Sequence, residues 1–385
     1  MRLVADSGLW TTGPVTVATP LVAVLEVSGA VLSWVIDAAP EDTSPHITFT
    51  DVARAEWLWR VLGESGHVAL ASAVESAPTA GAASSVELAD VDIVPGSLDP
   101  LRRLAVGHWL RRWWPASRQD GIAGLDRALL DVEVALLTAG AQGYFFDDTL
   151  DSDVVELLAP HAPALGMHAR DGDPRILDLV RAGAGLADEV GIDGVGWPEL
   201  HAYLDDSREV SRTAVTTPSG RRDDYALAAG ADAAPPDAVR IARGVTSINW
   251  TAVPPGIFDA AEDTVEWTVE VAGTSVVARV RADLIGPGPA TGVEVRLRSG
   301  AIGGSGALDA DGRATLPLVA DRRGPLTESA AWVHDWSATS VIVGAEGGTE
   351  TRAARERARR WARGRLDRPP NDAFLAEILA AESEY

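Results

Sequence analysis

The most regular pattern of apolar and polar positions lies between 263 and 282, where every second residue is apolar over two consecutive runs. A period of two predicts strands with one buried face. Gly273 and Thr274 separate the runs and fit a two-residue type II′ turn, which takes glycine at its first position. Closing the hairpin there predicts three cross-strand pairs, which are Trp267 with Val280, Val269 with Ala278, and Glu266 with Arg281.

The strand pattern extends over residues 237–346, where about seven predicted strands alternate with regular turn signals, as in an antiparallel β-sandwich. Two stretches in it read V-E-V-R-L at 293–297 and A-L-D-A-D-G-R-A-T-L-P-L at 307–318, with Gly300 between them. They resemble the carboxypeptidase regulatory-like (prealbumin-like) β-sandwich family and its V-x-V-x-L … D-A-D-G-R pattern. The resemblance covers residues 238–345, and it implies an Ig-like accessory domain without catalytic residues of its own.

Residues 1–95 predict a β-rich mixed α/β domain. Apolar runs broken by Gly, Pro and Ser predict strands, and helical spacing after Thr50 predicts one helix that ends at Gly63. The predicted strands are 15–17, 21–27, 30–36, 46–49, 68–74 and 86–94, the helix is 51–62, and 77–85 is a small-residue loop.

From 97 to 212 the apolar period changes to that of helices. Asp99 before Pro100 and Asp173 before Pro174 are signals of a helix start. The pattern predicts an α-helical domain, followed by a linker at 213–236. The predicted helices are 99–114, 121–138, 153–158, 173–190 and 198–210.

Residues 347–385 predict two further helices. Thr349 or Thr351 caps an arginine-rich helix that reaches about 363, and Asn371 caps a terminal amphipathic helix. The whole chain is therefore predicted to be an α+β multidomain protein: a β-rich N-terminal α/β domain, a central helical domain, and a C-terminal antiparallel β-sandwich with a helical tail.

The net charge of −23 disfavours nucleic acid and anionic membranes as partners, because the mean field repels phosphate. The chain has no cysteine, which excludes thiol nucleophiles, disulfides and Cys-ligated metal sites. All 33 basic residues are arginine, which argues against P-loop, pyridoxal-phosphate and protein-kinase chemistry and is typical of a high-GC bacterial genome. The first residues show no signal-peptide pattern, and no apolar run reaches the ~20 residues of a membrane span. We therefore expect a cytoplasmic protein.

The sequence shows no recognisable catalytic or metal-binding motif. The histidines form no H-E-x-x-H pair, and Pro163 and Gly166 between His161 and His168 argue against a shared helix. Carboxylates at Asp147, Asp148, Asp151 and Asp153 could serve a hydrolase or hold a cation, although capping of a helix is the simpler interpretation of such residues. We expect no cofactor and no metal.

The arginine-rich helix is the most unusual feature of an otherwise acidic chain. Three interpretations are open: packing on the chain's own acidic surface, docking of an acidic partner protein, and binding of nucleic acid or membrane, which the net charge opposes. A second arginine–tryptophan stretch at 102–114 has tryptophans at four-residue spacing, which is more typical of a helical core than of a nucleic-acid surface. The candidate partner-binding residues are Arg352, Arg355, Arg359, Arg363, Trp361, Phe374, Leu375, Ile378 and Leu379.

These features predict a non-enzymatic interaction or adaptor component of a cytoplasmic bacterial multi-protein system, with a role in defence as one option. The partner would be another protein, of acidic character, bound through the C-terminal helices. The alternative hypothesis is a carboxylate-dependent hydrolase with its site near 147–153.

Overall fold

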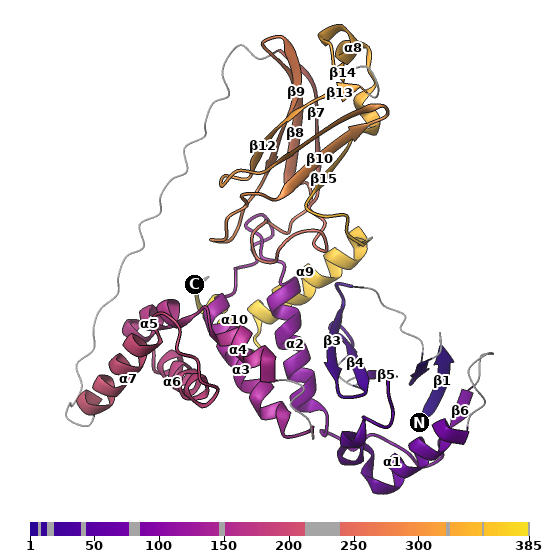
Figure 1. Ribbon diagram of the computed structural model, residues 1–385, viewed down its shortest axis with the longest axis vertical. Helices are drawn as coiled ribbons and strands as arrows, with labels where there is room; N and C mark the ends of the chain where they lie inside the picture. The colour runs from indigo at the N-terminus through magenta and orange to yellow at the C-terminus, as the bar shows by residue number, and fades with distance from the viewer. Residues whose placement is uncertain are drawn as a thin grey trace. The chain divides into compact units, whose positions relative to one another are not determined.

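The computed structural model describes residues 1–6, 9–13, 19–39, 44–76, 85–145, 151–211, 239–320, 324–348 and 350–383 (Figure 1). The fold is mixed α+β with three antiparallel sheets, which confirms the predicted fold class. Contacts within the chain define two compact units. The first consists of Met1–His201 together with Thr349–Tyr385, and the second of Ala202–Gly348.

The first unit contains a six-stranded sheet with the strand order β3-β4-β5-β2-β1-β6. Alternating burial along β4 shows that one face of the sheet is packed, as the period-two pattern predicts. The predicted strands at 21–27, 30–36 and 46–49 are confirmed, whereas β1 and β2 were not predicted. The strands are β1 (Arg2–Asp6), β2 (Leu9–Thr11), β3 (Val22–Val27), β4 (Ala30–Val35), β5 (His46–Phe49) and β6 (Ser85–Glu87).

The segment after this sheet differs from the prediction. The 3-10 helix η1 (Glu56–Leu58) leads into α1 (Trp59–Ser76), so the strand predicted at 68–74 is wrong. That stretch is rich in alanine, which favours a helix, and Leu70 buries its side chain completely. Gly63, with φ of 73°, interrupts the helix without ending it. The strand predicted at 86–94 is limited to β6.

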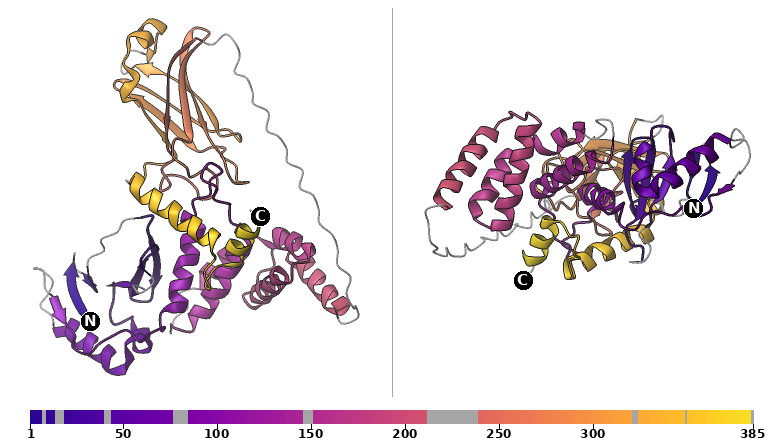
Figure 2. Two further views of the ribbon diagram at one scale, coloured as in Figure 1. Left: turned by 180° about the vertical axis from the view of Figure 1, so that it is seen from behind. Right: turned by 90° about the horizontal axis from the view of Figure 1, so that it is seen from below.

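Helices form the rest of the first unit. The helix predicted at 121–138 starts only at Arg127, where Asp126 caps it, and the helix at Ala162–Asp171 was not predicted. Asp173 caps its helix as predicted. Helices α5 and α6 pack on one another, as both views of Figure 2 show. The helices are α2 (Asp99–Trp113), α3 (Arg127–Gln142), α4 (Asp151–Leu158), α5 (Ala162–Asp171), α6 (Pro174–Glu189) and α7 (Trp197–Ser211), the last of which crosses the boundary between the units.

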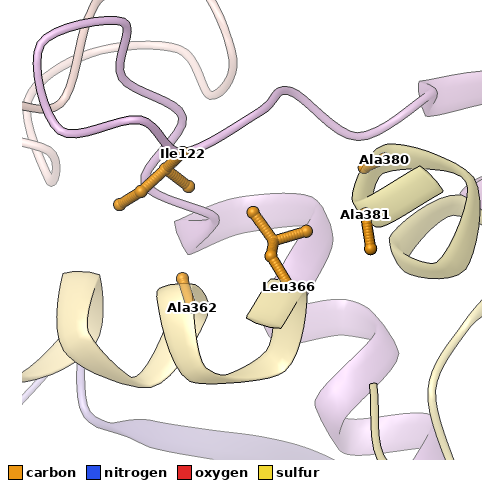
Figure 3. Packing of buried hydrophobic residues seen from close by; sticks show 5 residues of the cluster. All are labelled: Ile122, Ala362, Leu366, Ala380 and Ala381. Carbon is orange, nitrogen blue, oxygen red and sulfur yellow. The ribbon is translucent and has the colours of Figure 1, made fainter. Parts of the chain in front are cut away.

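The C-terminal helices α9 (Arg352–Asp367) and α10 (Leu375–Ser383) belong to this first unit. Thr351 caps α9, whereas α10 starts too late for Asn371 to cap it, so that prediction is wrong. Both helices contribute to a small apolar cluster with the loop before α3 (Figure 3). Its buried members are Ile122, Ala362, Leu366, Ala380 and Ala381.

The second unit holds a four-stranded sheet with the order β12-β9-β8-β7 and a five-stranded sheet with the order β14-β13-β11-β10-β15 (Figure 1). Strands β8 and β9 pair in the register that the sequence predicts, including Trp267 with Val280 and Glu266 with Arg281. Gly273 has φ of 64°, as the predicted turn requires. The strands are β7 (Arg240–Thr246), β8 (Val265–Ala272), β9 (Ser275–Ala282), β10 (Glu294–Ser299), β11 (Ile302–Ala307), β12 (Arg313–Pro317), β13 (Val319–Ala320), β14 (Gly324–Pro325) and β15 (Ser340–Val343).

The stretch from 327 to 343 is extended only at its end. Thr327 caps the short helix α8 (Glu328–Val333), the 3-10 helix η2 (Trp336–Ala338) follows, and β15 is the strand. The glycine-rich stretch 303–306 is part of strand β11, in the hairpin that β11 forms with β10. The predicted strand 15–17, most of the loop 77–85, the linker 213–236, and Asp147 and Asp148 lie outside the described residues.

Candidate functional site

The arginines of α9 divide into two groups. Arg352, Arg360 and Arg363 lie on one side of the helix with Glu356, because successive members of this set are four, four and three residues apart. Arg352 is exposed, and the side chains of Arg360 and Arg363 are 69% and 40% exposed. We call Arg352, Glu356, Arg360 and Arg363 the outer face of α9.

The second group of arginines pairs with carboxylates of the same unit. Arg357 forms two hydrogen bonds of 2.7 Å with Asp37, beyond the end of β4. Arg355 lies 3.9 Å from Glu350, whose side chain is almost completely buried. Arg355 and Arg359 are candidate partner-binding residues, but the structure places them on the packed side of the helix.

Arg359 is the most enclosed of these cations, with a side chain only 3% exposed. Its guanidinium lies 3.2 Å from a carboxylate oxygen of Asp120, in the loop before α3, and 3.4 Å from Glu356. A buried cation is stable only when carboxylates surround it, so these pairs hold α9 against the loop. In the sequence, the interval of four residues between Arg355 and Arg359 indicates that they share a helical face. It does not show whether other parts of the protein cover that face.

Helix α10 is attached through its N-terminus. The backbone N–H of Leu375 donates a 2.7 Å hydrogen bond to Glu133 of α3, and the N–H of Phe374 donates to Glu377 over 2.9 Å. Burial raises the pKa of Glu133, and the negative charge of Glu377 adds to this, although Arg103 and the Leu375 N–H act against it. These carboxylates occupy the place of a helix cap.

The aromatic candidates of the tail are also packed within the first unit. Phe374 is fully buried, with Arg103 5.3 Å from its ring centroid. Trp361 meets Trp109 edge to face, with ring centroids 4.9 Å apart, and Trp109 is itself buried and donates to the carbonyl of Pro20. This confirms the interpretation of Trp109 as core. Leu375, Ile378 and Leu379 are half-buried.

The structure also shows a network that the sequence did not predict, centred on Asp131 of α3. Its carboxylate accepts hydrogen bonds from Arg111 over 2.5 Å and Arg127 over 2.9 Å, and it lies 2.9 Å from Nε2 of His161. Burial alone would raise the pKa of Asp131, but the hydrogen bonds from His161 and Arg111 and the charge of Arg127 hold it below its usual value. The carboxylate therefore stays ionised inside the helical bundle.

A second pair, His168 with Asp126, lies 2.7 Å apart between the same two helices, α5 and α3. The hydrogen bond with Asp126 raises the pKa of His168, which outweighs the effect of its partial burial. Since His161 precedes α5 and His168 lies within it, both histidines attach this helix to α3. His161 stands just outside the helix, so the two histidines do not share it, although Pro163 in the first turn does not prevent a helix between them.

The acidic stretch at 147–153 is described only in part. Of its four candidates, only Asp153 has a described side chain, and burial raises the pKa of that carboxyl, helped by nearby Glu156. Across the described ranges, no group of three His, Asp or Glu side chains is placed to hold a metal ion. No helix in the described part of the chain is both long and apolar enough to span a bilayer.

Comparison with known proteins returns no match: no family model, no curated protein and no solved structure resembles this chain significantly. Any functional conclusion must therefore come from the geometry itself.

Proposed function

We propose that this chain is a non-enzymatic adaptor of a bacterial multi-protein system and that the outer face of α9 binds an acidic segment of another protein. The observation that supports this is an excess of positive charge at one carboxylate. Glu356 lies within 3.4 Å of Arg359 and of Arg360, and 4.0 Å from Arg363. Arg359 also pairs with Asp120, so on the outer face Glu356 is the one carboxylate for Arg360 and Arg363, and Arg352 has no ion-pair partner among the described residues.

The electrostatics favour a protein over a polyanion. A net charge of −23 repels nucleic acid and anionic membrane at long range. Salt screens a local cationic face beyond about 8–10 Å. A short acidic segment can come within this distance, whereas a long polyanion would also meet the repulsion of the acidic surface around it. Exposed ion pairs of this kind contribute about 0–1 kcal/mol each, so binding is expected to weaken strongly with salt.

Charge reversal on the outer face tests the proposal without disturbing the packed side of α9. We expect the triple variant R352E/R360E/R363E to lose a defined partner that the wild-type protein captures from its host at low salt. Quantitative mass spectrometry of the captured proteins is the measurement. Deleting 349–385 is less informative, because it would also remove Phe374 from the core.

The matched control reverses three exposed arginines that lie elsewhere, R2E/R243E/R298E, with the same change in net charge. It should retain the partner and lose it only at high salt. If the outer-face variant and the control captured equal amounts of the partner, the proposal would be refuted. Recovery of the protein without any partner at low salt would count against an adaptor altogether.

A further inference from the structure

The N-terminal sheet and α1 enclose a groove of about 430 Å³, a size typical of ligand-binding sites. One wall comes from β2 and β5, where Trp10 and Phe49 stand directly opposite each other in the strand register. The other wall is a strip of α1 formed by His67, Ala71 and Val74, at helical intervals of four and three. Unlike the core face of a helix, this strip is only partly covered.

The rim of the groove carries negative charge. Asp51, Glu56 and Glu75 contribute three carboxylates, and His67 is the single basic side chain among the described residues that line it. Glu56 and Glu75 are exposed and have no hydrogen-bond or ion-pair partner among the described residues. One oxygen of Asp51 accepts from the N–H of Ala53, which leaves its second oxygen for another donor. These carboxylates do not stabilise the fold through any pair within the described residues.

Phe49 is buried, so the half-buried Trp10 is the ring that a ligand can reach, and it lies beside carboxylates without an ion-pair partner among the described residues. This combination matches one kind of ligand group. A guanidinium is planar and weakly hydrated, so it stacks on an aromatic ring while its N–H groups bind carboxylates in pairs. An ammonium group lacks the flat face, and an apolar group would leave the carboxylates without a counter-charge. We propose that this groove binds an arginine side chain of a partner peptide. The groove lies apart from α9 in sequence and has the opposite charge, so this site is independent of the acidic partner proposed above.

The test uses fluorescence anisotropy with a labelled, flexible peptide that carries one arginine between glycines, titrated with the full-length protein. A second peptide replaces arginine with citrulline, which keeps the shape and removes the charge. We expect at least tenfold weaker binding of the citrulline peptide. We also expect at least tenfold weaker binding of the arginine peptide by E56Q/E75Q, in which both exposed rim carboxylates are neutral.

The control variant E64Q/E87Q removes two exposed carboxylates of the same region, on α1 and β6, that do not line the groove. It should bind the arginine peptide as the wild-type protein does. Equal affinity for the citrulline peptide, an unchanged affinity in E56Q/E75Q, or no binding at millimolar protein would each overturn the proposal. Failure of this test would leave the outer face of α9 unaffected.

Discussion

Arg365 and Glu377 join the two C-terminal helices through paired hydrogen bonds of 2.5 and 2.7 Å. The side chain of Glu377 is completely buried, and that of Arg365 is only 11% exposed. Glu377 also accepts from the N–H of Phe374, so one carboxylate both caps α10 and connects it to α9. The burial of Arg365 would lower its pKa, but the hydrogen bond and charge of Glu377, together with Asp372, raise it.

Replacing Glu377 with alanine should strongly destabilise the first unit, because Arg365 would remain buried without its main counter-charge. Loss of one partner of a buried pair costs about 3–5 kcal/mol. The free energy of unfolding from urea denaturation measures the effect. The control is Glu382→Gln, which breaks the exposed pair with Arg175 and should cost less than about 1 kcal/mol. Similar losses in both variants would contradict the role given to Glu377.

Gly107 allows α2 to approach α3 and the tail closely. A Cβ atom there would lie 2.7 Å from a methyl group of Val134 and 2.9 Å from the ring of Phe374. We expect Gly107→Ala to destabilise the protein by about 1–3 kcal/mol through overpacking. Gly140 of α3, which has open space around it, is the control, and its change to alanine should stabilise the helix by about 0.8–1 kcal/mol. Thermal and urea unfolding of both variants would show opposite signs.

His108 should make the protein less stable in mild acid. Its pKa is lowered to about 4 by burial and by the charge of Arg111, helped by Arg127 and opposed by Asp131. The unfolded chain binds a proton near pH 6.5 that the folded chain refuses until about pH 4, so stability falls as the pH decreases through that range. The full difference is about 3–4 kcal/mol.

A non-titrating side chain removes this dependence. His108→Gln should therefore show a flatter curve of unfolding free energy against pH between about 4 and 6.5 than the wild-type protein. The same slope in His108→Gln as in the wild type would mean that other groups cause the acid sensitivity.

In the sandwich, Gly244 of β7 pairs with Trp267 of β8. A Cβ atom on Gly244 would lie 2.5 Å from the Trp267 ring, so Gly244→Ala must displace the tryptophan. We expect a loss of about 1–3 kcal/mol in the second unit and a shift of the Trp267 indole signal in NMR spectra. Gly348→Ala, where nothing lies within 4 Å, is the control and should change neither.

Local pattern was sufficient where a structure is built from neighbouring residues. The register of β8 and β9 follows from the alternation of apolar and polar residues and from the two-residue turn. Both features predict the same cross-strand pairs. The caps at Asp173 and Thr351 are equally local, since each side chain reaches an N–H two or three residues further on. By contrast, the apolar residues of the 68–74 stretch are compatible with the period of a strand and with that of a helix, so its helix depends on packing.

The sites could be predicted only in part, because they depend on contacts between segments that are distant in the sequence. The arginine cluster was visible, but the distinction between Arg359, buried against Asp120, and Arg360, exposed, depends on which side of α9 faces the protein. Asp131 and His161 are 30 residues apart, and no spacing rule connects them. The groove beside Trp10 and Phe49 likewise requires β2 to pair with β5, which is far from it in the sequence.

The sequence by itself determined the α+β composition, the strand register of the β8–β9 hairpin, the helix caps at Asp173 and Thr351, and the absence of cysteine and lysine chemistry. These depend on composition or on interactions over a few residues. Tertiary structure alone decided which arginines of α9 are buried, which histidines meet which aspartates, and where carboxylates surround an aromatic groove. Those outcomes depend on contacts between distant segments, whose free energy is set by burial and by the charges that packing brings together.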